Sequence, residues 1–300
     1  MPVSRLSWIV LTSLFLAACS NGERTAQATA EAGLASTEPT GAANTTLSPY
    51  QLAVANQSRP EADRLRDGTR KPAEVLEFFD VAEGMHVLDM FSGGGYYTEI
   101  LAYLVGPEGK VYAQNNQAYL DFVKDEVKTR FADDRLANVE RLNIAVADLD
   151  LPANGIDVAL LILSYHDLYY RPGDDSWPII DGPAMLSDIY DSLKPGGVLG
   201  VVDHNANPGV DKIAAATDLH RIEMMVVRCE IESAGFGFAG SVDLLRSSED
   251  DLSAPMYAEG IRGKTDRFVL RFHKPIAVGG EAAPSAACAT WARARIDEQP

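Results

Sequence analysis

Cysteine is scarce in this chain, which has only three among 300 residues: Cys19, Cys229 and Cys288. None lies in a CxxC motif or among closely spaced histidines, so the sequence gives no support for a cysteine-bound zinc site. Cys229 and Cys288 could pair in an oxidising compartment, but two residues alone do not establish a bond. Cys229 also continues a helical pattern of apolar residues over 219–229, which favours a place in the core.

Positive charge is also in short supply. Lysine and arginine number 26 against 43 acidic residues, and the net charge is −17. A nucleic acid or an anionic membrane surface requires a basic face, so this balance excludes sequence-independent binding to either. We therefore expect a small-molecule substrate as the partner of this chain and no nucleic acid.

The N-terminal apolar run, Leu6 to Ala18, is too short to span a bilayer as a helix. It follows Arg5 and has the length of a secretory h-region, so residues 1–19 read as a signal peptide. The run ends in LAAC, which resembles the lipobox of bacterial lipoproteins, and this resemblance implies lipidation of Cys19. Ser20 would then favour the outer membrane. We expect an exported protein, lipid-anchored and facing the periplasm; the alternative is an ordinary cleaved signal with an incidental cysteine.

The rest of the chain divides by composition. Residues 20–48 are rich in Ala, Thr, Ser and Gly and have no hydrophobic periodicity, as expected of a flexible tether. Residues 49–276 have the patterns of one folded domain, and the Ala-rich residues 277–300 predict a poorly ordered tail. The charged segment before Pro72 is either a solvated helix face or a part that closes over a ligand.

The stretch VLDMFSGGGYYTEILA, residues 87–102, predicts a buried strand, a glycine turn and a helix, the arrangement with which α/β domains receive nucleotide-like ligands. The nearly continuous apolar run over 156–167 is typical of a strand that is covered on both faces, and so of a parallel sheet. A doubly wound α/β fold follows. The other predicted strands are 110–114, 139–148, 198–202, 236–244 and 267–272.

The glycine turn discriminates between cofactors. A GxGxxG fingerprint that begins at Gly93 requires glycine at position 98, where this chain has Thr98, and this disfavours a nicotinamide-dependent oxidoreductase. Asp89, before the turn, would repel a pyrophosphate. Its carboxylate suits a ligand with a cationic amino acid part and no phosphate, namely S-adenosylmethionine.

The order and spacing of VLDMFSGGGYYTEILA, GKVYAQN, Asp148, IDVALLILSYHD and LKPGGVLGVVD resemble the motifs of class I S-adenosylmethionine-dependent methyltransferases. Within them the chain looks most like the secreted or lipoprotein "predicted methyltransferase" group. The resemblance implies a Rossmann-like, mostly parallel seven-stranded sheet with a C-terminal antiparallel strand pair, and S-adenosylmethionine as cofactor.

The same resemblance implies roles for individual residues. Asp89 and the turn would hold the methionine part of the cofactor, and Asp148 would meet the adenine amino group. The acid that usually binds the ribose hydroxyls is replaced by an amide, Gln114, Asn115 or Asn116, and Phe91 stands where the family has its first glycine. The implied cofactor-binding residues are Asp89, Ser92, Gly93, Gly94, Gly95, Asn115, Asp148 and Ser164.

Candidate chemistry lies beyond the carboxyl ends of two strands, at 164–170 and 203–205. In one hypothesis His166 or His204 is a general base, and Tyr165, Tyr169 and Tyr170 line the acceptor pocket. In the other, Asp167, Asp203 and Asn205 bind Mg²⁺, as the positions of metal-dependent catechol-type methyltransferases suggest, although His204 interrupts their adjacent Asp and Asn. The candidate catalytic residues are His166, Asp167, His204 and Tyr165.

These observations predict methyl transfer from S-adenosylmethionine to a small molecule or an exposed group. The cofactor is made in the cytoplasm, however, and the leader predicts export. The alternative is therefore a catalytically inactive lipoprotein that binds a ligand or a partner on a methyltransferase fold, which Phe91 and the neutral Asn115 would favour.

Overall fold

The computed structural model describes residues 46–174, 176–276 and 285–297. The predicted signal peptide, Cys19 and nearly all of the predicted tether lie outside these residues. The domain begins with a capping box, in which the Ser48 hydroxyl accepts a hydrogen bond from the Gln51 N–H and the Gln51 side chain accepts one from the Ser48 N–H. The first helix, α1 (Pro49–Val54), follows directly.

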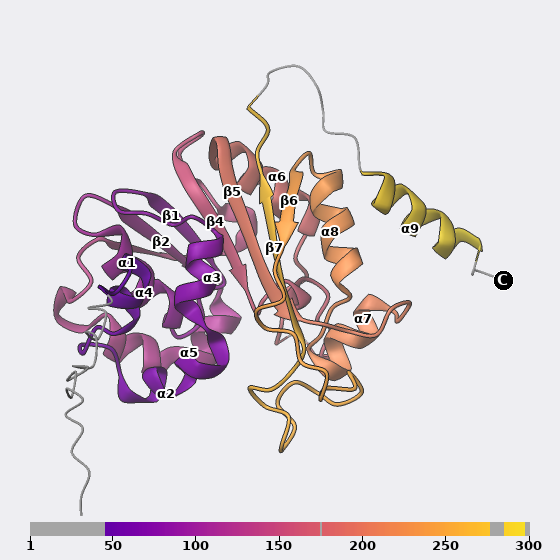
Figure 1. Cartoon of the computed structure of the whole chain (residues 1–300), viewed down its shortest axis with the longest axis horizontal. Coiled ribbons are helices and arrows are strands. Elements are labelled where there is room, and N and C mark those ends of the chain that lie inside the picture. Colours follow the sequence, from indigo (N-terminus) through magenta and orange to yellow (C-terminus); the bar gives the residue numbers. More distant parts are fainter. Residues whose placement is uncertain (1–45, 175, 277–284, 298–300) are drawn as a thin grey trace, which may run out of the picture. The chain divides into compact units, whose positions relative to one another are not determined.

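A seven-stranded sheet forms the centre of the domain, with the order β3-β2-β1-β4-β5-β7-β6 (Figure 1). The pairs along β3, β2, β1, β4 and β5 are parallel, while β7 runs antiparallel to both β5 and β6. This confirms the predicted doubly wound α/β fold with its C-terminal antiparallel pair. The strands are β1 (His86–Met90), β2 (Lys110–Asn115), β3 (Val139–Asn143), β4 (Ile156–Ile162), β5 (Leu193–His204), β6 (Gly237–Ser241) and β7 (Arg267–His273).

Helices cover both faces of the sheet. Side chains alternate along each central strand, so Val87 and Val158 pack with α1, α3 and α4, whereas Leu88 and Ala159 pack on the opposite face with α6 and α8. The longer helices are α2 (Glu61–Arg70), α3 (Pro72–Phe78), α4 (Tyr96–Val105), α5 (Gln117–Arg130), α6 (Gly182–Ser192), α8 (Met224–Ser233) and α9 (Ala286–Asp297). None of the helices in the described part of the chain has the length and apolar character needed to cross a membrane.

Several predicted boundaries are wrong. The predicted strand over 139–148 ends at Asn143, and 146–148 form a 3₁₀ turn, so Asp148 leaves the sheet. The run over 156–167 ends at Ile162, before a second turn at His166–Leu168. The single helical pattern over 219–229 is two elements in the structure. A short helix, α7 (Lys212–Ala214), runs into a π-helical turn (Ala215–Leu219), and α8 begins only at Met224.

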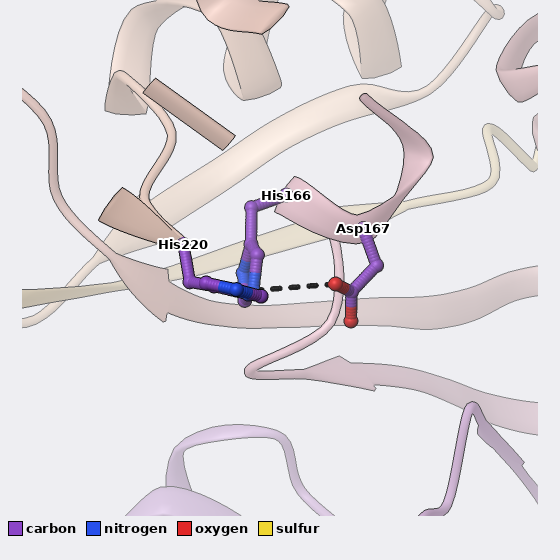
Figure 2. Close-up of side chains that lie close together, drawn as sticks. All are labelled: His166, Asp167 and His220. Atoms are coloured by element: carbon purple, nitrogen blue, oxygen red, sulfur yellow. Dashed lines mark ion pairs between the residues drawn. The ribbon is translucent and has the colours of Figure 1, made fainter. Parts of the chain in front are cut away.

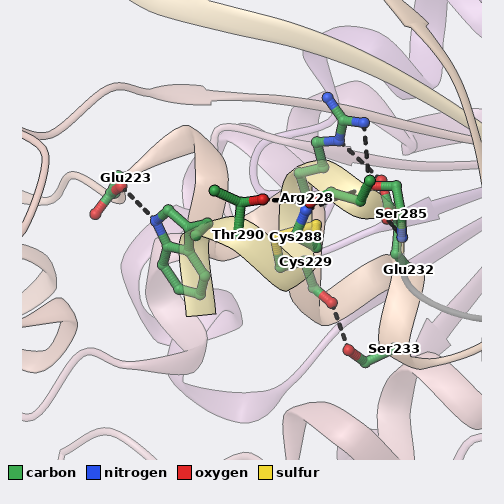
Figure 3. Close-up of a disulfide and its surroundings, with 10 residues drawn as sticks. Glu223, Arg228, Cys229, Glu232, Ser233, Ser285, Cys288 and Thr290 are labelled. Carbon is green, nitrogen blue, oxygen red and sulfur yellow. Dashed lines mark hydrogen bonds and ion pairs between the residues drawn. A yellow bond between two sulfur atoms is a disulfide. The ribbon is translucent and has the colours of Figure 1, made fainter. Parts of the chain in front are cut away.

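The prediction of a poorly ordered tail is wrong for residues 285–297, which include α9. A disulfide joins Cys288 of α9 to Cys229 of α8 (Figure 3). Both cysteines are buried, which confirms the core position that the sequence predicts for Cys229. Cys229 also links α8 covalently to α9. Beside it, Glu232 accepts hydrogen bonds from Arg228 and from the Ser285 N–H. Residues 277–284 and 298–300 lie outside the described part.

Candidate functional site

The glycine turn between β1 and α4 is held by an amide of the neighbouring strand. Asn115, the last residue of β2, accepts a hydrogen bond from the Gly93 N–H at 2.9 Å and donates to the Gly93 carbonyl and the Ser92 hydroxyl, each at 3.0 Å. The Asn115 side chain therefore forms its hydrogen bonds with the turn. This geometry does not provide the predicted contact with a ribose. A Cβ atom added at Gly93 would meet open space, so this side of the turn is accessible to a ligand.

Phe91 adopts the left-handed conformation that the family's glycine makes easy, with φ of 51°. Two contacts hold it there. Its N–H donates to the Gln114 side chain at 3.2 Å, and its ring stacks on Tyr119 with the ring centroids 5.3 Å apart. The departure from the family pattern is thus compensated by neighbours on β2 and α5.

Asp89 is 3% exposed at the end of β1, where it accepts a hydrogen bond from the Thr98 hydroxyl at 2.6 Å. Burial raises the pKa of the Asp89 carboxyl to about 7, against the opposing effect of that hydrogen bond. A cation that approaches the Asp89 carboxyl group would therefore strongly stabilise its ionised form. Thr98, the residue that disfavours NAD, is the partner of this carboxylate.

An ion network packs against the other side of the turn. Arg130 of α5 donates to the Gly94 carbonyl and forms ion pairs with Glu99 of α4 and Asp63 of α2, the latter at 2.7 Å. Arg130, Glu99 and Asp63 are all buried. Asp63 of the charged segment before Pro72 therefore packs against the helices that flank the glycine turn, whereas Lys71 of the same segment is exposed.

Two buried polar atoms near the predicted cofactor site have no hydrogen-bond partner among the described residues: the Ser164 hydroxyl oxygen and the Asn116 side-chain nitrogen. Each follows the carboxyl end of a strand, β4 or β2. A buried group without a partner is costly, and a ligand at this edge of the sheet would satisfy both. Asp148, predicted to meet the adenine, is exposed on its 3₁₀ turn.

A second cluster lies beyond β4 and β5. Both oxygens of Asp203 hold His166, one accepting its backbone N–H at 2.9 Å and the other lying 2.8 Å from the ring Nδ1. The opposite ring nitrogen, Nε2, lies 3.4 Å from Asp167. His220 completes the group, with its ring centroid 5.5 Å from that of His166 (Figure 2). Sequence reasoning missed His220 because it placed this residue inside a predicted helix over 219–229. The mixture of small and polar residues in AATDLH was the available signal for a break in that helix.

The histidines of this region differ in protonation. Asp203 and Asp167 raise the pKa of His166 to about 9, although burial acts in the opposite direction and is the larger single effect. Burial, and to a smaller extent the nearby His166, lower the pKa of His220 to about 4. Burial also lowers the pKa of His204 well below its usual range, so His204 is neutral.

Other predicted residues are engaged elsewhere. The Tyr165 hydroxyl donates to Glu230 at 2.9 Å, and both residues line a cavity of about 1790 Å³ that α6, α8 and α9 border. His204 Nδ1 lies 2.7 Å from the Thr265 hydroxyl. Asn205 donates to Asp266 and accepts from the Met224 N–H. With Asp203 occupied by His166, the structure does not assemble the predicted ligand set of Asp167, Asp203 and Asn205.

Tyr119 of α5 connects the two halves of the site. Its hydroxyl donates to Asp167, and its ring stacks on Phe91 of the glycine turn. Trp177 packs against the same tyrosine and donates to the Asp167 carbonyl at 3.0 Å. The glycine turn and the histidine cluster are therefore neighbours at one edge of the sheet, the carboxyl ends of β1 and β4, where doubly wound folds bind their ligands.

The sheet order, with an antiparallel β7 between β5 and β6, identifies the fold. The chain has the fold of a class I methyltransferase. The methyltransferase sheet places the aspartate of β1 and the glycine turn next to its switch point, as found here for Asp89 and residues 92–95.

Comparisons with known proteins also lead to methyltransferases. Residues 68–148 match the family of protein-L-isoaspartate(D-aspartate) O-methyltransferases. Demethylmenaquinone methyltransferases are similar over part of the chain: that of Listeria monocytogenes is 28% identical over 133 residues, 43% of this chain and 49% of its own, and that of Geobacillus stearothermophilus is 29% identical over 126 residues, 42% and 47%. The chain thus spans about half the length of the curated relatives that it matches.

Solved structures with partial similarity include an S-adenosylmethionine-dependent methyltransferase from Aquifex aeolicus, with 21% identity, 76% of this chain and 99% of that chain covered, and a TM-score of 0.49. An arsenic(III) S-adenosylmethionine methyltransferase from Chlamydomonas reinhardtii is 17% identical, with 74% and 76% covered and a TM-score of 0.43.

Two arginines that the sequence analysis did not assign to a site, Arg70 and Arg267, both act electrostatically on the buried Tyr97 of α4. Arg267 of β7 donates to the Thr69 carbonyl at 2.7 Å, and Arg70 of α2 lies over the Tyr96 ring. Among the described residues neither arginine has a carboxylate within ion-pair distance. Burial lowers the pKa of both arginines, and the more distant Asp63 and Asp266 offset this only in part. Both arginines act on the buried Tyr97, so the two cations face the same region.

Proposed function

We propose that this chain transfers a methyl group from S-adenosylmethionine to a small-molecule acceptor bound beside the carboxyl ends of β1 and β4. One observation carries the proposal: a buried carboxylate, Asp89, lies directly before an accessible glycine turn on a class I methyltransferase sheet. The unpartnered Ser164 and Asn116 atoms at the same edge fit a bound cofactor.

The residues divide the task of binding. Asp89 holds the cationic amino group, and the accessible backbone at Gly93 accommodates the methionine part without a side chain in the way. Asn116 and Ser164 donate to or accept from the remaining polar atoms of the ligand. The half-buried Arg70 and the buried Arg267 hold the carboxylate of the ligand, which stabilises their own charges.

Bound in this way, S-adenosylmethionine supplies a methyl group on a positively charged sulfur. The protein then has to hold the acceptor in line with that group and exclude water, because positioning supplies much of the rate of such a transfer. His166 and Asp167 in the segment after β4 are placed for this, since Tyr119 joins Asp167 to Phe91 of the glycine turn. The methyltransferase names of the similar proteins favour catalysis over the inactive alternative.

Export and lipidation at Cys19 are part of the proposal. The leader sequence supports them, and so does the disulfide, because such bonds persist in oxidising compartments such as the periplasm. The test is mass spectrometry of the mature protein from membrane fractions, which should find a chain that begins at a diacylated Cys19. A chain that retains residues 1–18 in the cytoplasmic fraction would contradict it.

Calorimetry with S-adenosylmethionine tests the function. We expect micromolar binding, weakened at least about tenfold by Asp89→Ala through loss of a charge-assisted contact. Asp188→Ala, which changes an exposed carboxylate on α6, is the matched control and should bind like the unmodified chain. Absence of binding to the folded protein would refute the methyltransferase proposal, and tight binding of NADH would favour an oxidoreductase.

A further inference from the structure

We propose that His166, Asp167 and His220 bind a divalent transition metal ion such as Zn²⁺. One ligand atom from each of these residues lies within 4.8 Å of those of the other two. In Figure 2 the two imidazole rings lie together and the Asp167 carboxylate faces them. His166 and Asp167 are buried and His220 is half-buried, so the cluster is shielded but reachable from one side.

The surroundings fix which atoms face the shared space. Asp203 binds His166 through its backbone N–H and its Nδ1, which leaves Nε2 directed at Asp167. A carboxylate on the far nitrogen of a histidine is the usual outer partner of a metal ligand, because it sets the tautomer and the ring orientation. Tyr119 holds one Asp167 oxygen, and the other is the oxygen nearest His166.

His220 is held in place by an unusual backbone. It ends the π-helical turn Ala215–Leu219 with φ of 51° and ψ of 54°, a left-handed conformation that is rare for a residue with a side chain. Its ring contacts those of Tyr170 and Tyr257, with centroid distances of 4.7 and 5.6 Å. Short π-helical segments and strained residues concentrate at functional sites, and here both direct an imidazole toward His166.

The donor set selects the class of metal. Two imidazoles and one carboxylate suit zinc, iron and related ions, whereas Mg²⁺ prefers oxygen ligands alone. This differs from the all-oxygen set that the sequence suggests. Three protein ligands leave at least one position open, as in catalytic zinc sites. If the proposed methyl transfer holds, that open position would receive a hydroxyl or thiol of the acceptor beside the glycine turn; the metal site itself does not depend on this.

The test is Zn²⁺ binding to the chelator-treated full chain, measured by calorimetry. We expect one equivalent to bind, with affinity at least about 100-fold lower in His166→Ala and in His220→Gln, and about 10- to 100-fold lower in Asp203→Asn, which loses only the outer partner. His86→Ala is the matched control, because His86 is a half-exposed histidine at the opposite end of β1. Excess Mg²⁺ should not compete.

Cobalt provides a readout that does not depend on activity. Co²⁺ added to the unmodified chain should give visible absorption bands of a nitrogen- and oxygen-ligated site, and these should be absent from His220→Gln at an unchanged melting temperature of the metal-free protein. Zn²⁺ affinity that is equal in the unmodified chain, His166→Ala and His220→Gln would overturn the proposal, as would no binding at all. Titration of the same samples with S-adenosylmethionine distinguishes failure of the metal site from failure of the methyltransferase proposal.

Discussion

Thr98 donates a hydrogen bond to Asp89 across 2.6 Å, and neither side chain has more than 3% of its surface exposed. The pair joins the first turn of α4 to the end of β1, across the glycine turn. It gives a physical reason for threonine at a position where dinucleotide-binding proteins need glycine, because among the described residues the Thr98 hydroxyl is the one side chain that donates a hydrogen bond to this buried carboxyl group.

The Asp89 pair predicts how cofactor binding depends on pH. The pKa of the Asp89 carboxyl is raised to about 7, so it is largely protonated at pH 5.5 and largely ionised at pH 7.5. A cationic amino group binds the ionised form, so the affinity for S-adenosylmethionine should rise about 20-fold over this interval. Calorimetry at several pH values measures it. Asp89→Asn should bind weakly without this rise, and an equal rise in that variant would assign the titration to another group.

Asn115→Asp separates two roles for this position. If the residue binds the ribose hydroxyls, the acid restores the family pattern and binding becomes tighter. The structure predicts the opposite, because aspartate loses the two hydrogen bonds that Asn115 donates to Ser92 and Gly93 and places a charge against the Gly93 carbonyl. We expect affinity for S-adenosylmethionine to fall about tenfold, which corresponds to the loss of about one net hydrogen bond. Tighter binding would show that the turn does not need this amide.

Arg130→Met should destabilise the domain by about 3 to 5 kcal/mol, because it leaves Asp63 and Glu99 with a deficit of positive charge in a buried place. Urea unfolding measures the change. Lys110→Met is the control: it removes the half-exposed ion pair with Glu140 and should cost less than about 1 kcal/mol. Similar losses in both variants would mean that the buried network contributes no more than a surface pair.

Reduction of the Cys229–Cys288 disulfide should lower the free energy of unfolding by about 2 to 4 kcal/mol, since the bond closes a segment with a sequence separation of 59. Thermal melts with and without dithiothreitol measure this. The Cys229→Ser, Cys288→Ser double variant should melt like the reduced protein under both conditions. Protease should then cut first near α9, and resistance there after reduction would show that noncovalent packing suffices to hold that helix.

Most of the sheet could be predicted from the sequence, because buried parallel strands such as β4 consist of unbroken apolar runs. The antiparallel pairing of β7 followed from the family resemblance, whereas the glycine turn after Asp89 was predicted from the residues themselves. The strand ends were harder. Nothing local in VERLNIAVAD marks Asn143 as the last paired residue, since pairing depends on where β2 ends.

The site was predicted only in part. Asp89, His166 and Asp167 could be predicted because they lie at or just beyond the carboxyl ends of strands, where doubly wound sheets bind their ligands. His220 was missed because a helical period continues through it from Leu219, and the break is decided by tertiary contacts with Tyr170 and Tyr257. The hydrogen bonds that Asn115 makes were not predicted for a similar reason: its partners, Ser92 and Gly93, belong to a turn that is distant in sequence.

The π-helical turn before His220 gives the histidine cluster an unusual dependence on chain length. A π turn contains one residue more than an α-helical turn can hold, so loss of any single residue from Ala215–Leu219 would restore the ordinary helix and rotate His220 by roughly 100° about its axis. Whether His220 joins His166 and Asp167 therefore depends on a single inserted residue in this turn. Relatives that differ only in the length of this segment would separate into two chemical types while sharing every side chain of the glycine turn.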